Sequence, residues 1–195
     1  GPTDDWSGDF RVQVDEHEIA RADVRVKSKV LTVRASLDAH DFIPDTGTSL
    51  LGRTADLSLD VTPEADMETA VFSISLTAET MNLIAEGQVS PVDLQPLGAI
   101  QYELNILDVR PFNQLIGSVQ LNPFIMTGQF ATDKKNSSLS MEFADVSVVD
   151  GNRIKAVLGG RLDAIASADV EGIQIYGRGT AKDISGGFIE KSAGG

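Results

Sequence analysis

Apolar and polar residues alternate one by one along most of this sequence, and this period-two pattern restricts the fold more than any other feature. Between positions 20 and 27, alanine or valine takes every second place, and Arg, Asp or Lys takes the places between. Positions 31–38 repeat the pattern after Ser28-Lys29. Because side chains alternate across a strand, the two segments predict a hairpin of two strands that share one apolar face.

The same alternation recurs along the rest of the chain and predicts a mainly antiparallel β-domain of about ten to thirteen strands. Asp150-Gly151 is a strong two-residue hairpin signal between two such segments. Helical spacing is scarce, and we expect only one or two short helical turns, at residues 91–98 and 111–117. Further strands are predicted at residues 57–61, 72–78, 81–89, 100–106, 124–130, 139–143, 146–148 and 154–158, with weaker ones at 173–176 and 179–182.

No change in composition marks a boundary within the chain, so we expect a single β-domain at residues 3–184, as a fragment of a larger protein. Residues 185–195 hold four glycines and little apolar material, which predicts a flexible tail. Gly1-Pro2 is typical of the scar that a protease leaves when it removes an expression tag. No apolar run approaches the ~18 residues of a transmembrane helix.

Composition argues against several function classes. The net charge is −13 and no run of Lys or Arg offsets it, so nucleic acid is not an expected partner. The chain has no cysteine, which removes disulfides and zinc–sulfur sites. His17 and His40 have no identifiable partners for acid–base or metal chemistry, and no Gly-x-Ser-x-Gly elbow occurs. We therefore expect no enzyme activity, no metal and no cofactor.

The one-sided strands leave an open question about what covers their apolar faces. Burying one aliphatic side chain contributes roughly 1.5–3 kcal/mol, so several uncovered rows would be costly. The sheet can fold on itself as a dry sandwich, close as a barrel, or curl and leave a trough. Packing alone favours the sandwich. Gly87, Gly128 and Gly159-Gly160 fall at or beside apolar-face positions, and we predict that they mark a line where the sheet folds over.

A loose internal repeat is also visible. In each copy a strand is followed by an aspartate and an apolar segment with proline, which ends in Leu-Gly or Ile-Gly. The three copies cover residues 37–52, 89–98 and 107–117.

Two stretches resemble the AsmA-like superfamily of bacterial envelope proteins, which includes TamB and YhdP. The first, residues 84–98, reads IAEGQVSPVDLQPLG. The second lies within residues 121–162 and contains GQFATD, LSMEF and DGNRIKAVLGGRL. The resemblance covers roughly residues 80–165, with a fainter match at 20–60, and its motifs are patterns of strand and turn.

The resemblance implies a curved antiparallel sheet that forms a U-shaped, taco-like groove with an aliphatic lining. It also implies a periplasmic location, anchored in the inner membrane through a segment that this sequence lacks. Such proteins act in phospholipid transport between the inner and outer membranes and in outer-membrane integrity. The expected partners are phospholipid acyl chains and the rest of the full-length envelope protein.

We predict that acyl chains would contact the inward-facing rows of this groove. The alternative is a structural or adhesive β-domain with a dry core, which acts through protein–protein contacts at an outward apolar patch near Ile84 and Leu107. The predicted lipid-binding residues are Leu83, Ala85, Val89, Tyr102, Leu104, Ile106, Phe124, Met126, Phe130, Met141 and Phe143.

Overall fold

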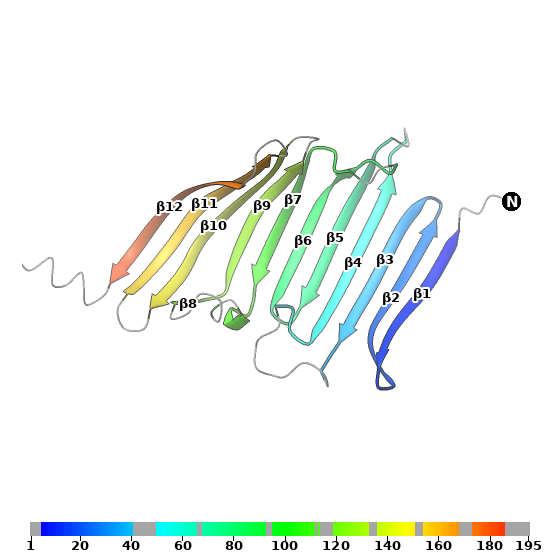
Figure 1. The fold of residues 1–195 in the computed structure, drawn as a ribbon, viewed down its shortest axis with the longest axis horizontal. Coiled ribbons are helices and arrows are strands. Elements are labelled where there is room, and N and C mark those ends of the chain that lie inside the picture. Colours follow the sequence, from blue (N-terminus) through cyan, green and yellow to red (C-terminus); the bar gives the residue numbers. More distant parts are fainter. Residues whose placement is uncertain are drawn as a thin grey trace, which may run out of the picture.

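The computed structural model is one open, curved antiparallel sheet of twelve strands (Figure 1). This confirms the mainly β fold class that the alternation predicts. The structure describes residues 5–40, 50–65, 68–92, 95–111, 113, 119–132, 136–150, 154–167 and 173–185. The predicted tail lies outside these ranges apart from Ser185, and so does Gly1-Pro2.

The strands follow one another as a meander, because almost every strand pairs with the next strand in sequence. The exceptions are β7, which pairs with β9, and the short β8, which pairs with the end of β10. The strands are β1 (Trp6–Val14), β2 (His17–Lys27), β3 (Val30–Asp38), β4 (Thr54–Pro63), β5 (Ala70–Ala78), β6 (Met81–Val89), β7 (Ala99–Ile106), β8 (Val119–Leu121), β9 (Phe124–Thr132), β10 (Asn136–Asp150), β11 (Ile154–Ser167) and β12 (Ile173–Ser185).

Tight turns join the first three strands. Ser28 and Lys29 have φ of 49° and 68°, and Asp15 and Glu16 have φ of 48° and 72°. Two consecutive residues with positive φ give the turn whose twist matches that of the flanking strands. The predicted turn at Ser28-Lys29 is therefore confirmed. At the predicted Asp150-Gly151 hairpin, Asp150 pairs with Ile154, and the residues between them lie outside the described ranges.

The sheet neither closes into a barrel nor folds onto itself. All substantial contacts between the described strands are between ladder neighbours. The two edges, β1 and β12, lie at opposite ends of the sheet in Figure 1. The dry sandwich that packing alone favours does not form, and the open, curled alternative is the one observed.

Helical structure is confined to one turn in the described residues, at Arg110, Pro111 and Asn113, where the Asn113 N–H donates to the Val109 carbonyl at 2.8 Å. This confirms the start of the turn expected at 111–117, of which residues 112 and 114–117 lie outside the described ranges. Residues 91–98 are not helical where the structure describes them, so that expectation is wrong.

Ladder pairing explains why residues 91–98 do not form a helical turn. Val89 forms a bridge with Pro96, and the Leu97 N–H donates to the Gln88 carbonyl at 2.8 Å. These contacts pair the end of β6 with residues that precede β7, with the register shifted by two residues from that of the β6–β7 ladder. Backbone pairing to the preceding strand therefore takes precedence over local helical spacing.

Two of the three repeat segments begin with the same conformation. The Asp38 Oδ1 accepts hydrogen bonds from the His40 backbone N–H at 3.3 Å and from the His40 ring at 2.9 Å. The Asp108 Oδ1 accepts from the Arg110 backbone N–H at 2.9 Å and from its Nε at 3.0 Å. The intervening residue is buried in both cases. The first residues of the segments after β3 and β7 are thus equivalent in structure, whereas Val89 and Pro96 lie at the opposite strand ends.

We predicted that Gly87, Gly128 and Gly159-Gly160 mark a line where the sheet folds over, but this is not a feature that all of them share. Pairing is regular on both sides of Gly128. Gly87 pairs with Phe72 of β5, but on its other side the β6–β7 ladder ends at Glu86 and Gln101. Gly159-Gly160 lie beside a register shift between Phe143 and Val146 of β10. At Gly87 and Gly128 an aromatic ring takes the space of the missing side chain. Phe72 covers Gly87, and Tyr102 covers Gly128.

Gly128 gives a direct test of this packing. A Cβ there would overlap the Ser140 carbonyl oxygen and lie 2.6 Å from Tyr102 Cζ, so Gly128→Ala should destabilise the fold by ~1–3 kcal/mol. No heavy atom lies within 4 Å of a Cβ at Gly177, so Gly177→Ala should be neutral or stabilise by up to ~1 kcal/mol. Urea unfolding of both variants measures the difference. Equal stabilities would contradict the close approach at Gly128.

Candidate functional site

The candidate site is the apolar face, by which we mean the side of the sheet on which the alternating aliphatic and aromatic residues lie. Two rows of this face cross most of the strands through directly paired residues. We call them the leucine row and the tyrosine row. The leucine row is Phe10, Ala22, Ala35, Leu57, Leu76, Leu83, Leu104, Met126 and Phe143. The tyrosine row is Val24, Val33, Leu59, Ile74, Ala85, Tyr102, Gly128, Met141 and Leu162.

These rows are continuous because each strand is paired so that its apolar residues lie directly opposite the apolar residues of the next strand. In an antiparallel pair, directly opposed residues point to the same side of the sheet. A slip of one residue in any strand would move its apolar set to the other side. The alternation in the sequence and the pairing in the structure agree from β2 to β10, so one side of the sheet is apolar throughout.

The structure places all eleven predicted lipid-binding residues on this face, in the adjacent strands β6, β7, β9 and β10. Ala85 and Ile106 are buried, at 8% and 1% exposure. The remaining nine are half-buried, since cross-strand neighbours cover their flanks and no described layer covers their tips.

The face extends further than those eleven residues, because β1 to β5 continue the leucine row and β2 to β5 continue the tyrosine row. The alternation of β2 to β5 carries this signal in the sequence. The same signal is present in β1, where Trp6, Phe10 and Val12 alternate with polar residues, but we predicted no strand there. In the structure these three side chains are 52%, 55% and 53% exposed at the edge of the face.

Small residues open a hollow of about 310 Å³ in the N-terminal part of the face. Its floor contains four alanines from β2, β3 and β4, and larger side chains from β1, β3, β4 and β5 stand around them. Such a depression can take a methylene chain or a bulky apolar group. Its apolar lining includes Phe10, Val12, Ala20, Ala22, Ala35, Leu37, Leu51, Ala55, Leu57 and Leu76.

Tyr102 is the polar member of the two rows, and its hydroxyl makes a hydrogen bond within the protein. It lies over Gly128 and donates to the Ser140 carbonyl at 3.0 Å, so one side chain links β7 to β10 across β9. Burial raises the pKa of Tyr102 above its ordinary value. A molecule on this face would therefore meet apolar surface at both rows rather than a hydrogen-bonding group.

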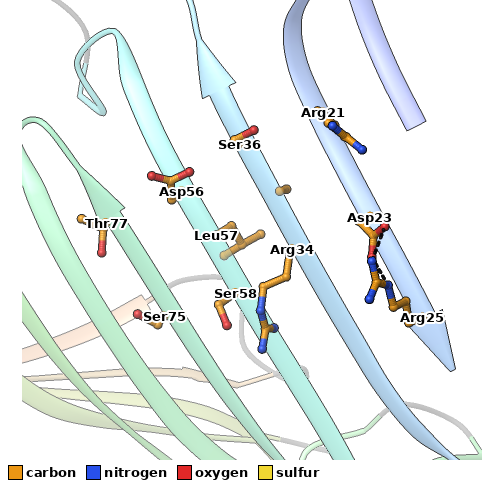
Figure 2. A pocket seen from close by; sticks show the side chains of 11 residues that line it. Arg21, Asp23, Arg25, Arg34, Ser36, Asp56, Leu57, Ser58, Ser75 and Thr77 are labelled. Carbon is orange, nitrogen blue, oxygen red and sulfur yellow. Dashed lines mark hydrogen bonds and ion pairs between the residues drawn. The ribbon is translucent and has the colours of Figure 1, made fainter. Parts of the chain in front are cut away.

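The opposite side of the sheet carries the charges. A second hollow, of about 430 Å³, lies there over β2 to β5 (Figure 2). Arginines and aspartates pair beside it: Arg25 Nε lies 2.6 Å from Asp23 Oδ1, and Arg21 Nη2 lies 2.7 Å from Asp9 Oδ2. Because these guanidinium groups face carboxylates, the hollow does not present the clustered free cations that a phosphate backbone needs.

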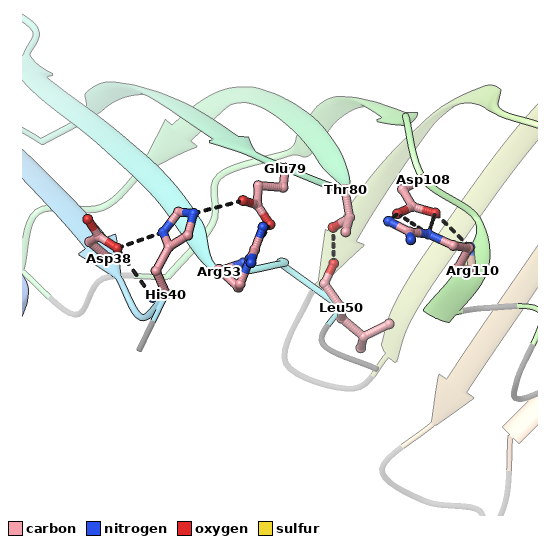
Figure 3. A network of polar contacts seen from close by, with 8 residues as sticks. All are labelled: Asp38, His40, Leu50, Arg53, Glu79, Thr80, Asp108 and Arg110. Atoms are coloured by element: carbon pink, nitrogen blue, oxygen red, sulfur yellow. Dashed lines mark hydrogen bonds and ion pairs between the residues drawn. The ribbon is translucent and has the colours of Figure 1, made fainter. Parts of the chain in front are cut away.

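A network of polar side chains lies where β3 and β5 end and β4 begins, near the first residues of the two repeat segments (Figure 3). The His40 ring lies between Asp38, at 2.9 Å, and Glu79, at 3.8 Å. The Glu79 carboxylate also accepts the Arg53 backbone N–H at 2.8 Å. The hydrogen bond from the His40 ring holds the pKa of Asp38 below its ordinary value. His40 therefore has carboxylate neighbours that its sequence position did not reveal, and they tie β3, β4 and the β5–β6 turn together.

In the ranges that the structure describes, no three His, Cys, Asp or Glu side chains gather closely enough to hold a metal ion. No helix among the described residues has the length and apolar character needed to cross a membrane. Comparison with protein-family models, with curated proteins and with solved structures found no match.

The polar side of β3 and β4 gives a pH prediction. Arg34 Nη2 lies 2.9 Å from Asp60 Oδ2, and Thr32 donates to Asp60 Oδ1 at 3.0 Å. The Arg34 guanidinium, helped by Thr32, holds the pKa of Asp60 below its ordinary value of 3.8. The stabilisation is thus fully present above that ordinary value and is lost as the pH falls through the lower, folded-state pKa.

We expect Asp60→Asn to lower the melting temperature slightly at pH 7, since exposed ion pairs contribute at most ~1 kcal/mol. The gap to the wild type should shrink below about pH 4. Asp56→Asn is the matched control, because Asp56 lies on the same strand and has no ion pair among the described residues. A gap that stays constant from pH 7 to pH 3 would contradict this linkage.

Proposed function

We propose that this chain is a lipid-binding module of an AsmA/TamB-type envelope protein, and that acyl chains lie on the apolar face. The proposal assigns no catalytic role, metal or cofactor to the module. The observation that carries it is the continuity of the leucine and tyrosine rows across the sheet, with no described layer over them. The resemblance at residues 84–98 and 121–162 supplies the family, the periplasmic location and the role in phospholipid transport.

The size of the face supports a chain-like apolar ligand. Neighbouring strands lie ~4.8 Å apart and each row crosses nine strands, so a row is about 38 Å long. The hydrocarbon core of a bilayer is ~30 Å thick, and the acyl chains of one leaflet therefore span about 15 Å. The face has room for several such chains, either end to end along a row or side by side on neighbouring rows.

The energetics support the same ligand. Each methylene group that leaves water contributes ~0.8 kcal/mol, without any requirement for direction. The half-buried tips of Leu83, Leu104 and Met126 offer such a surface, and the Tyr102 hydroxyl makes its hydrogen bond to the protein. A face of this kind suits acyl chains better than a polar metabolite, which would leave its own hydrogen-bonding groups unsatisfied.

The adhesive alternative relies on an outward patch around Ile84, and the surroundings of this residue do not favour it. Ile84 is 49% exposed, but it pairs directly with Ser75 on one side and Glu103 on the other. A contiguous apolar patch is what marks a protein–protein site, whereas single exposed apolar residues are common. We therefore rank lipid binding above adhesion through Ile84.

A photo-crosslinking pair tests the proposal. A photoreactive amino acid at Leu104 faces the apolar side, and the same amino acid at the adjacent Glu103 faces the charged side. With vesicles of radiolabelled phosphatidylethanolamine, we expect labelling from position 104 and at most background labelling from 103. The pair Met126 and Thr127 repeats the comparison on β9. Equal labelling from both members of each pair would overturn the proposal.

Native mass spectrometry gives an independent measurement. The purified protein should carry co-purified phospholipid, and Leu83→Asn should reduce the lipid-bound fraction because it places an amide on the leucine row. Ile84→Asn is the matched control, since it makes a similar change on the other side of the same strand. Absence of bound lipid from the wild type, in detergent-free preparations, would count against the proposal.

A further inference from the structure

The two halves of the apolar face differ in the size of their side chains. In β2, β3 and β4, four alanines form the floor of the hollow of about 310 Å³. In β7 and β9, the corresponding rows carry large side chains, namely Leu104, Phe124 and Met126. The face is therefore hollowed on its N-terminal half and filled out on its C-terminal half.

β5 lies midway between these two halves. The leucine row has four members on either side of Leu76, with Phe10 at one end and Phe143 at the other. In a two-fold symmetric contact, the same surface is used on both copies. A second copy that is turned about an axis along β5 therefore lays its filled half over the hollowed half of the first copy, and each row faces the same row in the reverse order.

This arrangement brings small residues opposite large ones. Residues at equal distances from β5 face each other, and the alanines of the floor meet the large side chains of the other copy. Two packed layers reach native density when large and small side chains alternate across the interface in this way. The facing pairs include Ala22 with Met126, Ala35 with Leu104 and, in the neighbouring row, Ala20 with Phe124.

The area of the face is sufficient for a stable dimer. A row is about 38 Å long, and β3 contributes residues to four neighbouring rows, Leu31, Val33, Ala35 and Leu37. Four rows spaced two residues apart cover ~20 Å along the strands. The footprint is thus about 760 Å² on each copy, close to the ~800 Å² per partner that a standard protein–protein interface buries.

We propose that two copies of this chain pack face to face about a two-fold axis along β5 when no lipid is bound. The two sheets then form, between copies, the dry sandwich that a single chain does not form, with layers ~10 Å apart. The contact uses the same face on both copies, so association ends at the dimer. Acyl chains and the second copy compete for this face, and only that competition rests on the proposed function.

Sedimentation equilibrium of the lipid-free protein is the first test. The wild type should form a concentration-dependent dimer and no larger species. Leu76→Lys should raise the dimer dissociation constant by ~10-fold or more, because it places two charges at the dry two-fold axis. Ser75→Lys is the matched control and should dimerise like the wild type, since Ser75 is exposed on the other side of β5. A monomeric wild type, or growth into longer oligomers, would overturn the proposal.

A size swap tests which residues face each other. Ala22→Met sets two large side chains against each other, and Met126→Ala leaves a void, so each variant should weaken the dimer. The double variant should dimerise more tightly than either single variant, because it exchanges the members of one facing pair. Within one chain these residues lie six strands apart, ~29 Å, so the recovery has to arise between copies. A double variant that is weaker than both single variants would exclude this register.

Lipid addition separates this proposal from the proposed function. Vesicles of phosphatidylethanolamine should convert the dimer into a lipid-bound monomer, with lipid labelling from a photoreactive residue at position 104. A lipid-free monomer that is labelled at this position would overturn the dimer and leave the proposed function standing. A dimer that is never labelled would have the opposite meaning, and a dimer that is labelled without dissociating would contradict the competition.

Discussion

The antiparallel backbone ladder fixes where every described strand residue points. In each pair of neighbouring strands, apolar residues lie directly opposite apolar residues, so the alternation of one strand continues in the next. Leu57, Leu76, Leu83 and Leu104 share a row for this reason, although they come from four separate segments of the chain. The apolar face exists because these registers agree, and no catalytic group or metal is needed to position it.

Sequence alternation predicted the strands and the face well, because a period of two is a local property of the chain. It identified the hairpin at Ser28-Lys29, and it placed all eleven predicted lipid-binding residues on one side of the sheet. It did not reveal that the face lacks a second layer, because alternation says which side is apolar and nothing about what covers it. It also missed β1, where Gly8 interrupts the apolar pattern between Trp6 and Phe10.

Local signals were less reliable wherever long-range pairing competes with them. Prolines and apolar spacing suggested a helical turn at residues 91–98, but Val89 and Leu97 are held by ladder contacts instead. The glycines suggested bends, but Gly128 is explained by its neighbours: the Tyr102 ring and the β10 backbone take the space that a side chain would need. Which strand lies beside a glycine is a property of the fold, so the sequence could mark these positions as unusual without giving the reason.

The chemistry of the apolar face determines how selective it can be. Selective sites place a few polar groups against matching groups of the ligand, and an unmatched partner leaves them unsatisfied. In the leucine and tyrosine rows the side-chain hydroxyl is that of Tyr102, and it is hydrogen-bonded to the Ser140 carbonyl. Binding at these rows therefore depends on apolar area and on the shape of the hollow beside Phe10, not on the identity of a head group. Under the proposed function, such a surface would accept the acyl chains of many lipids and would not by itself distinguish lipid classes.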